Sequence, residues 1–73
     1  MRTSLRNTNL TDANLAHADC SFVDFRGADF RRANLKGTIL KGADLRGAIN
    51  LTREQLAEAI VDGSTLLPDE LRA

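Results

Sequence analysis

Two residues of the chain, His17 and Cys20, have side chains that could attack a substrate, move a proton or ligate a metal. They are the only histidine and the only cysteine in the sequence. Nucleophilic catalysis needs such a pair within hydrogen-bond reach, and a metal site needs both side chains to converge on one point. Whether they meet depends on the elements that carry them and on the direction in which each side chain points.

Apolar residues occur at every fifth position over most of the chain. They are Leu5, Leu10, Leu15, Cys20, Phe25, Phe30, Leu35, Leu40 and Leu45. A small or β-branched residue stands two places before each of them, and Asp or Asn usually stands one place before. An α-helix repeats every 3.6 residues and a strand every 2, so neither has this period. On a helix, the apolar positions would spiral around every face.

Three extended residues followed by a two-residue corner do account for the period. Alternation along the extended part sends the small and the large residue inward and the Asp or Asn between them outward. Gly27, Gly37, Gly42 and Gly47 stand at the second corner position, where a type II turn requires a positive φ. Four corners close a coil of about 20 residues, and coils stack about 4.8 Å apart.

Side chains one coil apart then lie above one another in the core. The predicted stacks are Leu5 with Phe25 and Leu45, Leu10 with Phe30, Leu15 with Leu35, and Cys20 with Leu40. The fold class predicted from the pattern is an all-β solenoid of about two coils.

The same register separates the two candidate catalytic residues. It points His17 outward at a corner and Cys20 into the core, where they can neither form a dyad nor share a metal. We therefore expect no catalytic residue, no metal, no cofactor and no small-molecule substrate, and we do not expect an enzyme. The glycines recur at a five-place spacing instead of forming a phosphate-binding loop before a helix.

Four segments carry a family resemblance: Ala13-Asn14-Leu15, Ala28-Asp29-Phe30, Ala33-Asn34-Leu35 and Ala43-Asp44-Leu45. They resemble the A(D/N)Lxx pattern of the pentapeptide-repeat family over residues 3 to about 49. The resemblance implies a right-handed quadrilateral β-helix. Ile39 and Ile49 depart from the pattern, because Asp or Asn is usual at their positions.

The period ends after residue 50. Thr52 followed by Gln55 has the spacing of a capping box, and Gly63 suits the position after a helix end, so we predict a helix from about Arg53 to Val61. Around Pro68 a short turn or a single helical turn is expected. The tail resembles the capping segment of many bacterial members of the family. The predicted organisation is residues 1–50 as repeats and residues 51–73 as capping helix and tail, in one domain.

The net charge is zero, but its distribution is uneven. Residues 26–46 hold six basic residues against two acidic ones, and residues 47–73 hold two basic against five acidic. A surface that meets an acidic partner is one interpretation of the six basic residues, which are Arg26, Arg31, Arg32, Lys36, Lys41 and Arg46. The other is a solvated wall in which outward Asp24 and Asp44 alternate with arginines in weak ion pairs.

The expected function is a structural or protein-interaction module. The alternative is inhibition or protection of a nucleic-acid enzyme such as DNA gyrase by DNA mimicry, which the resemblance implies for some members. Two coils with a basic middle are a poor mimic of an acidic rod. Direct nucleic-acid binding is disfavoured because the register turns Phe25 and Phe30 into the core, so the basic wall lacks interleaved aromatic residues for stacking. No segment predicts membrane insertion, and a lone cysteine is typical of a cytoplasmic protein.

Besides an unidentified protein partner, we expect the chain to form a homodimer. Leu5, Leu10 and Leu15 belong to the first coil, which nothing in the pattern covers, so two copies should meet at that end. The competing site is the tail, where Leu66, Leu67 and Leu71 supply apolar surface. Phe22 should lie outward at a corner, across the backbone of Gly42 in the next coil.

Overall fold

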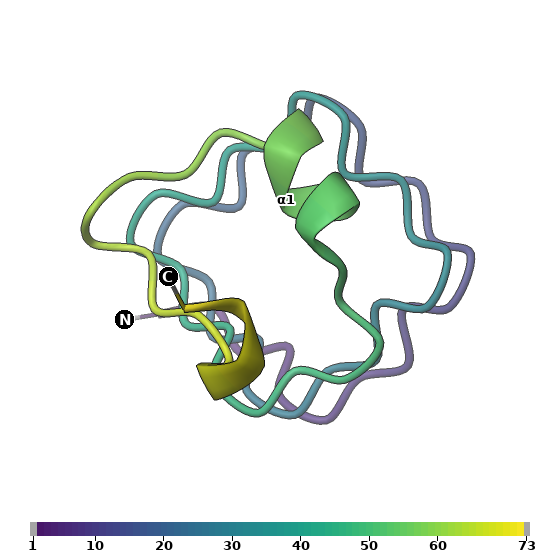
Figure 1. Ribbon diagram of the computed structural model, residues 1–73, viewed down its shortest axis with the longest axis horizontal. Helices are drawn as coiled ribbons and strands as arrows, with labels where there is room; N and C mark the ends of the chain where they lie inside the picture. Colours follow the sequence, from purple (N-terminus) through teal and green to yellow (C-terminus); the bar gives the residue numbers. More distant parts are fainter. Residues whose placement is uncertain (1, 73) are drawn as a thin grey trace.

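The computed structural model describes residues 2–72. Seen down its shortest axis, the chain winds around a closed path, and successive turns lie over one another (Figure 1). Parallel bridges join positions at one constant separation, from Ser4 with Asp24 to Asp29 with Ile49. This separation is one turn of the coil, as the five-residue period predicted. We call residues 3–22 the first coil and residues 23–42 the second, and the third coil begins at residue 43.

Single bridges, and not continuous strands, hold the coils together. The N–H of most core positions donates to the next coil, as in the 2.7 Å bond from Leu5 N to Asp24 O. From the second coil onward, the N–H of each bridge residue donates to the previous coil, as in the 2.9 Å bond from Asp24 N to Thr3 O. Within residues 2–72 no extended strand or sheet forms, because every bridge is isolated by the corner that follows it. The expected all-β architecture therefore appears only as columns of bridges.

The second residue of each corner has a left-handed backbone. Between residues 7 and 47 these residues are Asn7, Asp12, His17, Phe22, Gly27, Arg32, Gly37, Gly42 and Gly47, with φ between 56° and 72°. Sequence reasoning tied this conformation to glycine alone, but five of the nine corners use another residue.

A side-chain oxygen supports most corners. The Asp or Asn before each core position accepts a hydrogen bond from the first corner residue, as in the 3.0 Å bond from Thr11 N to Asn9 Oδ1 and the 3.1 Å bond from Lys36 N to Asn34 Oδ1. Asp and Asn fold back onto the backbone in this way readily, which stabilises a turn. Asn9, Asn14 and Asn34 are exposed, as expected, and their side chains also support the corners.

The core fills the centre of the coil. Phe25, Phe30, Leu35, Leu40 and Leu45 have no exposed surface, and Cys20 is buried. The rings of Phe25 and Phe30 pack edge to face, with centroids 5.2 Å apart. The remaining three positions of the predicted stacks, Leu5, Leu10 and Leu15, are half-buried and pack against this core.

Helix α1 spans Arg53–Glu58 and begins with the predicted capping box. Gln55 N donates to Thr52 Oγ1 over 3.1 Å, and Thr52 N donates to Gln55 Oε1 over 2.8 Å. The prediction of a helix reaching Val61 is wrong, since the C-cap Ala59 is extended. The helix ends early because Ile60 returns to the coil, where its N–H donates to Thr38 O over 2.8 Å.

The tail continues the coil but leaves its regular step. Ile60 pairs with Ile39, one place beyond the regular separation, and Leu66 pairs with Asp44, two places beyond it. The 3₁₀ helix η1 spans Asp69–Leu71, where a single helical turn was one of the two expectations. Figure 1 shows α1 and this tail at the same end of the coil.

Helix α1 takes over hydrogen bonds that another coil would make. Gln55 Nε2 donates to Phe30 O over 2.8 Å and to Ala33 O over 3.0 Å. Gly37 N donates to Glu58 O over 2.8 Å. One side chain and one helical carbonyl thus satisfy backbone groups of the second coil along the wall that α1 covers.

Candidate functional site

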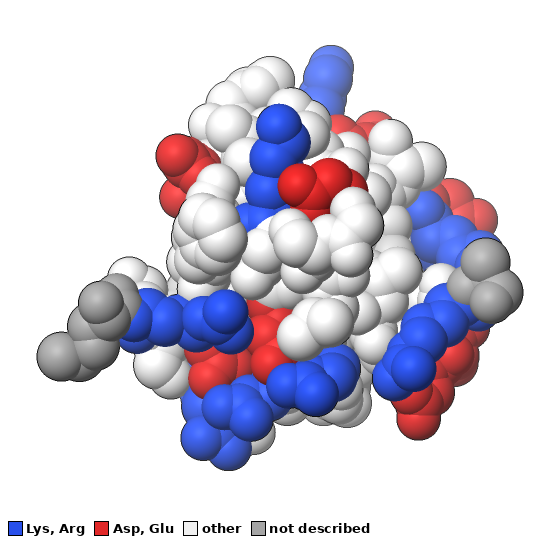
Figure 2. All heavy atoms as spheres, turned by 90° about the vertical axis from the view of Figure 1, so that its left-hand side faces the viewer, with Lys and Arg blue, Asp and Glu red and all other residues white. Residues whose placement is uncertain are grey.

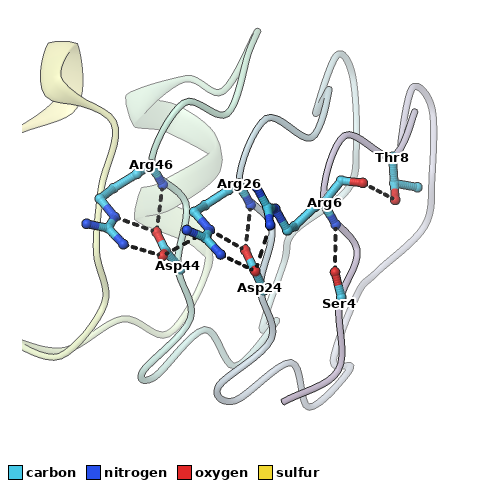
Figure 3. Close-up of polar contacts among 7 residues, drawn as sticks. All are labelled: Ser4, Arg6, Thr8, Asp24, Arg26, Asp44 and Arg46. Carbon is cyan, nitrogen blue, oxygen red and sulfur yellow. Dashed lines mark hydrogen bonds and ion pairs between the residues drawn. The ribbon is translucent and has the colours of Figure 1, made fainter. Parts of the chain in front are cut away.

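A column of alternating arginine and aspartate runs along one wall of the coil (Figure 3). Arg26 holds Asp24 with two parallel bonds, Nε to Oδ1 at 3.0 Å and Nη2 to Oδ2 at 2.9 Å. Arg46 holds Asp44 in the same way, at 2.9 and 2.7 Å. The regular step of the coil places each pair directly over the one before it, since Asp24 and Asp44 are bridge partners. We call Arg6, Asp24, Arg26, Asp44 and Arg46 the Arg–Asp ladder.

Contacts between coils join the rungs of the ladder. Arg26 Nε lies 3.6 Å from Asp44 Oδ2 in the third coil. Arg6 Nε lies 3.9 Å from Asp24 Oδ2 in the second coil. Ser4 occupies the aspartate position of the first coil, and its hydroxyl accepts from Arg6 N over 3.5 Å. Arg26 therefore contacts two carboxylates, one in its own coil and one in the next.

The two carboxylates of the ladder are buried, which corrects the expectation that they face solvent. The side chain of Asp24 is 8% exposed and that of Asp44 is 3% exposed, whereas the arginines above them are 42% and 52% exposed. The reason is that each guanidinium folds back over the carboxylate two positions before it. A buried carboxylate needs such a partner, because burial without one is costly.

Hydrogen bonding keeps both carboxylates charged. The side-chain bonds from Arg26 lower the pKa of Asp24 to about 2, against an ordinary value of 3.8. The bonds from Arg46 likewise lower the pKa of Asp44, despite the burial that opposes ionisation. In return, Asp24 raises the pKa of Arg26 and Asp44 raises that of Arg46. The ladder is therefore a fully ionised structural element at neutral pH.

The six basic residues predicted as a partner surface do not form one patch. They stand at successive corners of the coil, so they encircle it. Arg26 and Arg46 belong to the ladder, and Arg32 pairs with Asp12 of the first coil at 2.7 Å. Within residues 2–72, Arg31, Lys36 and Lys41 form no ion pair within 4.0 Å, and all three are exposed.

The face turned to the viewer in Figure 2 bears mixed charges. Basic and acidic side chains lie beside one another on it, separated by uncharged surface, and no large area carries a single sign. The uneven charge along the sequence therefore does not become a uniform charge on this face.

His17 and Cys20 have different environments, since His17 is exposed and Cys20 is buried. Cys20 is a free, buried cysteine, and burial raises the pKa of its thiol, which makes it a poor nucleophile. His17 is exposed at a corner, and its ring lies against Gly37 of the second coil, where an added Cβ would approach Nδ1 to 2.5 Å. Among residues 2–72, no three His, Cys, Asp or Glu side chains are placed to hold a metal ion together.

Phe22 lies against Gly42 in the same manner. The phenylalanine is 62% exposed, and a Cβ added to Gly42 would collide with its ring. The outward position expected for Phe22 is thus confirmed, and so is its contact with the glycine one coil above. Sequence reasoning found this contact but missed the equivalent one between His17 and Gly37, although the same step of one coil predicts it.

The first coil has an open edge within the described residues. The N–H groups of Asp24, Asp29, Asn34 and Ile39 donate to the first coil, but the equivalent groups of Ser4, Asn9, Asn14 and Asp19 have no acceptor among residues 2–72. Leu5, Leu10 and Leu15 lie half-buried next to this edge. A shallow pocket of about 390 Å³ lies at the opposite end of the ladder and is lined by Arg46, Thr65, Leu66, Leu67 and Arg72.

Comparison with known proteins places these features in a family. Neither helix of the described part of the chain is long and apolar enough to cross a membrane. No curated protein matches the chain closely enough to be counted as a relative. The family model for pentapeptide repeats matches eight copies, over residues 2–32 and 15–49. These matches cover well over half of the chain and coincide with the coil, and so the chain belongs to the pentapeptide-repeat family.

Proposed function

We propose that this chain is a non-catalytic structural and protein-interaction module. Its coil is proposed to be the right-handed quadrilateral β-helix that is usual in the family, with residues 1–50 as repeats and residues 51–73 as cap and tail of one domain. Support comes from the evenly spaced bridges between coils and from the hydrogen bonds that α1 makes to the second coil. The proposed location is the cytoplasm, where a free thiol such as Cys20 is stable.

The open edge of the first coil carries the proposal of an interaction function. It combines unpaired backbone donors with the half-buried side chains of Leu5, Leu10 and Leu15. Backbone groups at an uncovered edge favour pairing with another chain, and an apolar centre adds a hydrophobic contribution to that pairing. At the other end, Gln55 and the return of Ile60 to the coil already satisfy backbone groups of the second coil.

The proposed occupant of the edge is a second copy of this chain. A two-fold axis lets identical edges face each other, so the two apolar centres become one continuous core. The residue at the aspartate position of the first coil also favours this arrangement. It is Ser4, which adds no repelling carboxylate at the contact. A homodimer formed in this way leaves the corners free for a further protein partner.

The test is the oligomeric state of a charge variant, measured by light scattering or sedimentation. Leu10→Lys keeps an aliphatic stem against the core and places an ammonium group at the edge, where two copies would bring these charges together. We expect a dimeric wild type and a monomeric Leu10→Lys variant. Leu10→Met, which has a similar length and no charge, is the control and should remain dimeric. A wild type that stays monomeric at high concentration would refute the proposed self-association.

The corners offer contacts to a further partner with acidic groups. Arg31, Lys36 and Lys41 are exposed and form no ion pair within 4.0 Å in the described structure, so they can bind a carboxylate of another protein. DNA mimicry receives no support from these charges, because a mimic of duplex DNA must present a long acidic surface. The coil instead has basic residues around it, and the molecule with its helix and tail extends only 26 × 26 × 22 Å.

A further inference from the structure

The Arg–Asp ladder ends one carboxylate short. Arg6 lies near Asp24 of the next coil, and Arg26 lies near Asp44 of the next coil, at 3.9 and 3.6 Å. Arg46 repeats their position, but the residue that pairs with Asp44 from the following turn is Leu66. Within residues 2–72, the ion pair of Arg46 is therefore with Asp44 alone, and the face of its guanidinium toward the tail has no carboxylate.

The pocket of about 390 Å³ opens at this point of the ladder. Two arginines, Arg46 and Arg72, line it together with Thr65, Leu66 and Leu67. Figure 3 shows the Arg46 side chain at the end of the ladder next to the tail. The Thr65 hydroxyl is already engaged, since it donates to Leu40 O over 2.8 Å. Two arginines beside two leucines are therefore the groups that a ligand would meet.

The guanidinium group of Arg72 has donors left for a ligand. Its side chain forms one hydrogen bond, from Nη2 to Asp69 Oδ1, and the Asp69 side chain is 87% exposed. An exposed ion pair of this kind contributes little and exchanges readily with solvent or with another anion. Arg46, in contrast, is fixed by its two bonds to Asp44, so it presents its free edge in a defined orientation.

We propose that this pocket binds a carboxylate group, which takes the position of the missing rung between Arg46 and Arg72. A planar carboxylate matches the fork of a guanidinium, as both existing rungs of the ladder show. Leu66 and Leu67 add contact for a short aliphatic chain attached to the carboxylate. The carboxylate comes either from a small organic acid or from a Glu or Asp side chain of a partner protein. The second source rests on the proposed interaction function.

The first experiment follows the arginine Nε–H resonances by NMR while acetate is added at constant ionic strength, with chloride as the balancing anion. We expect saturable shifts at Arg46 and Arg72 in the wild type. Leu66→Asp supplies a tethered carboxylate and should abolish the response to acetate. Leu66→Asn has nearly the same shape without the charge and should retain it. Arg72→Gln should weaken binding several-fold without disturbing the buried Asp44.

Three results would overturn the proposal. They are equal shifts with chloride and with acetate, an unchanged acetate response in Leu66→Asp, and binding of inorganic phosphate as tight as that of acetate. All of these variants keep Arg46 and its bonds to Asp44, so a changed response to acetate does not arise from loss of that ion pair.

A second comparison distinguishes the two sources of the carboxylate. Propionate and N-acetyl-glutamic acid amide present the same group, without and with flanking peptide bonds. Tighter binding of propionate assigns the pocket to small organic acids, and tighter binding of the capped glutamate assigns it to a protein side chain. Light scattering on the same samples separates this site from self-association. Acetate binding by a monomer would refute the dimer alone, and a dimer without acetate binding would refute this site alone.

Discussion

Gln55 offers the sharpest test of how α1 is joined to the coil. Its Nε2 group donates to Phe30 O and Ala33 O, while its Oε1 accepts from Thr52 N. Gln55→Glu keeps the acceptor of the capping box but replaces the donor with a second carboxylate oxygen that faces two carbonyls. The variant therefore leaves the helix start intact and breaks only the contact between α1 and the second coil.

The expected loss follows from the two bonds. Each net hydrogen bond contributes about 1 kcal/mol, and a carbonyl left unsatisfied costs about 1–3 kcal/mol more. Phe30 O also accepts from Ala33 N, but Ala33 O has no other donor within residues 2–72. We therefore expect Gln55→Glu to lower the free energy of unfolding by about 3–5 kcal/mol. In a chain of this size each 1 kcal/mol corresponds to about 4–8 °C in Tm.

Urea unfolding measured over a range of pH provides the assay. The carbonyl oxygens should raise the pKa of the introduced carboxyl group above its unfolded value of about 4.3. A raised folded pKa contributes stability below the unfolded pKa, and this stability is lost as pH rises through the folded pKa. The variant should therefore regain stability in acid, where the protonated group donates again. Ala57→Glu adds the same charge to an exposed position of α1 and is the control. Equal losses in both variants, without acid rescue, would refute the assigned contact.

Three further variants test the corners, the ladder and the core. Because hydrogen bonding lowers the pKa of Asp24 from 3.8 to about 2, its contribution is complete above about pH 4 and is lost as pH falls through 2, so Asp24→Asn should flatten the acid dependence of Tm. Gly42→Ala should cost about 1–2 kcal/mol for its φ of 70° and more for the ring of Phe22, and in a Phe22→Ala background only the first part should remain. Additive losses in that double-mutant cycle would contradict the contact. Thr38→Val should cost about 1 kcal/mol in urea unfolding, because its buried hydroxyl donates to Leu15 O over 2.7 Å. An unchanged midpoint would show that the hydroxyl contributes nothing.

The stacking of the coils was predictable because it follows from the five-residue period of the sequence alone. A five-residue period leaves one arrangement in which Leu15 lies below Leu35 and Phe22 below Gly42, and both placements require only counting in whole coils. The encirclement by Lys36 and Lys41 follows from the same counting, since neighbouring corners face different directions. It was missed because charge was added along the sequence and not around the coil.

Two other features could not be obtained from the period. The direction of Asp24 was assigned from the strand-like alternation alone, and the arginine that folds over it depends on a side-chain geometry that spacing does not specify. The return of Ile60 and Leu66 to the coil lies beyond the end of the period. The helical signal of residues 53–61 was locally sound, but pairing with Ile39 required an extended chain and prevailed over propensity.

The changed step of the tail makes this end of the molecule a poor template for a further coil. A stack of equal coils is a template that could lengthen indefinitely, because each turn presents the next with the same pattern of donors and acceptors. Here Ile60 adds one residue to the step and Leu66 adds another, while α1 fills part of the same turn. The donors and acceptors of an incoming chain with the regular spacing could pair with only part of this end before the two patterns no longer coincide. The irregular spacing of the tail therefore opposes fibre formation at this end. Because it is a mismatch of backbone positions and not of charge, salt does not remove it.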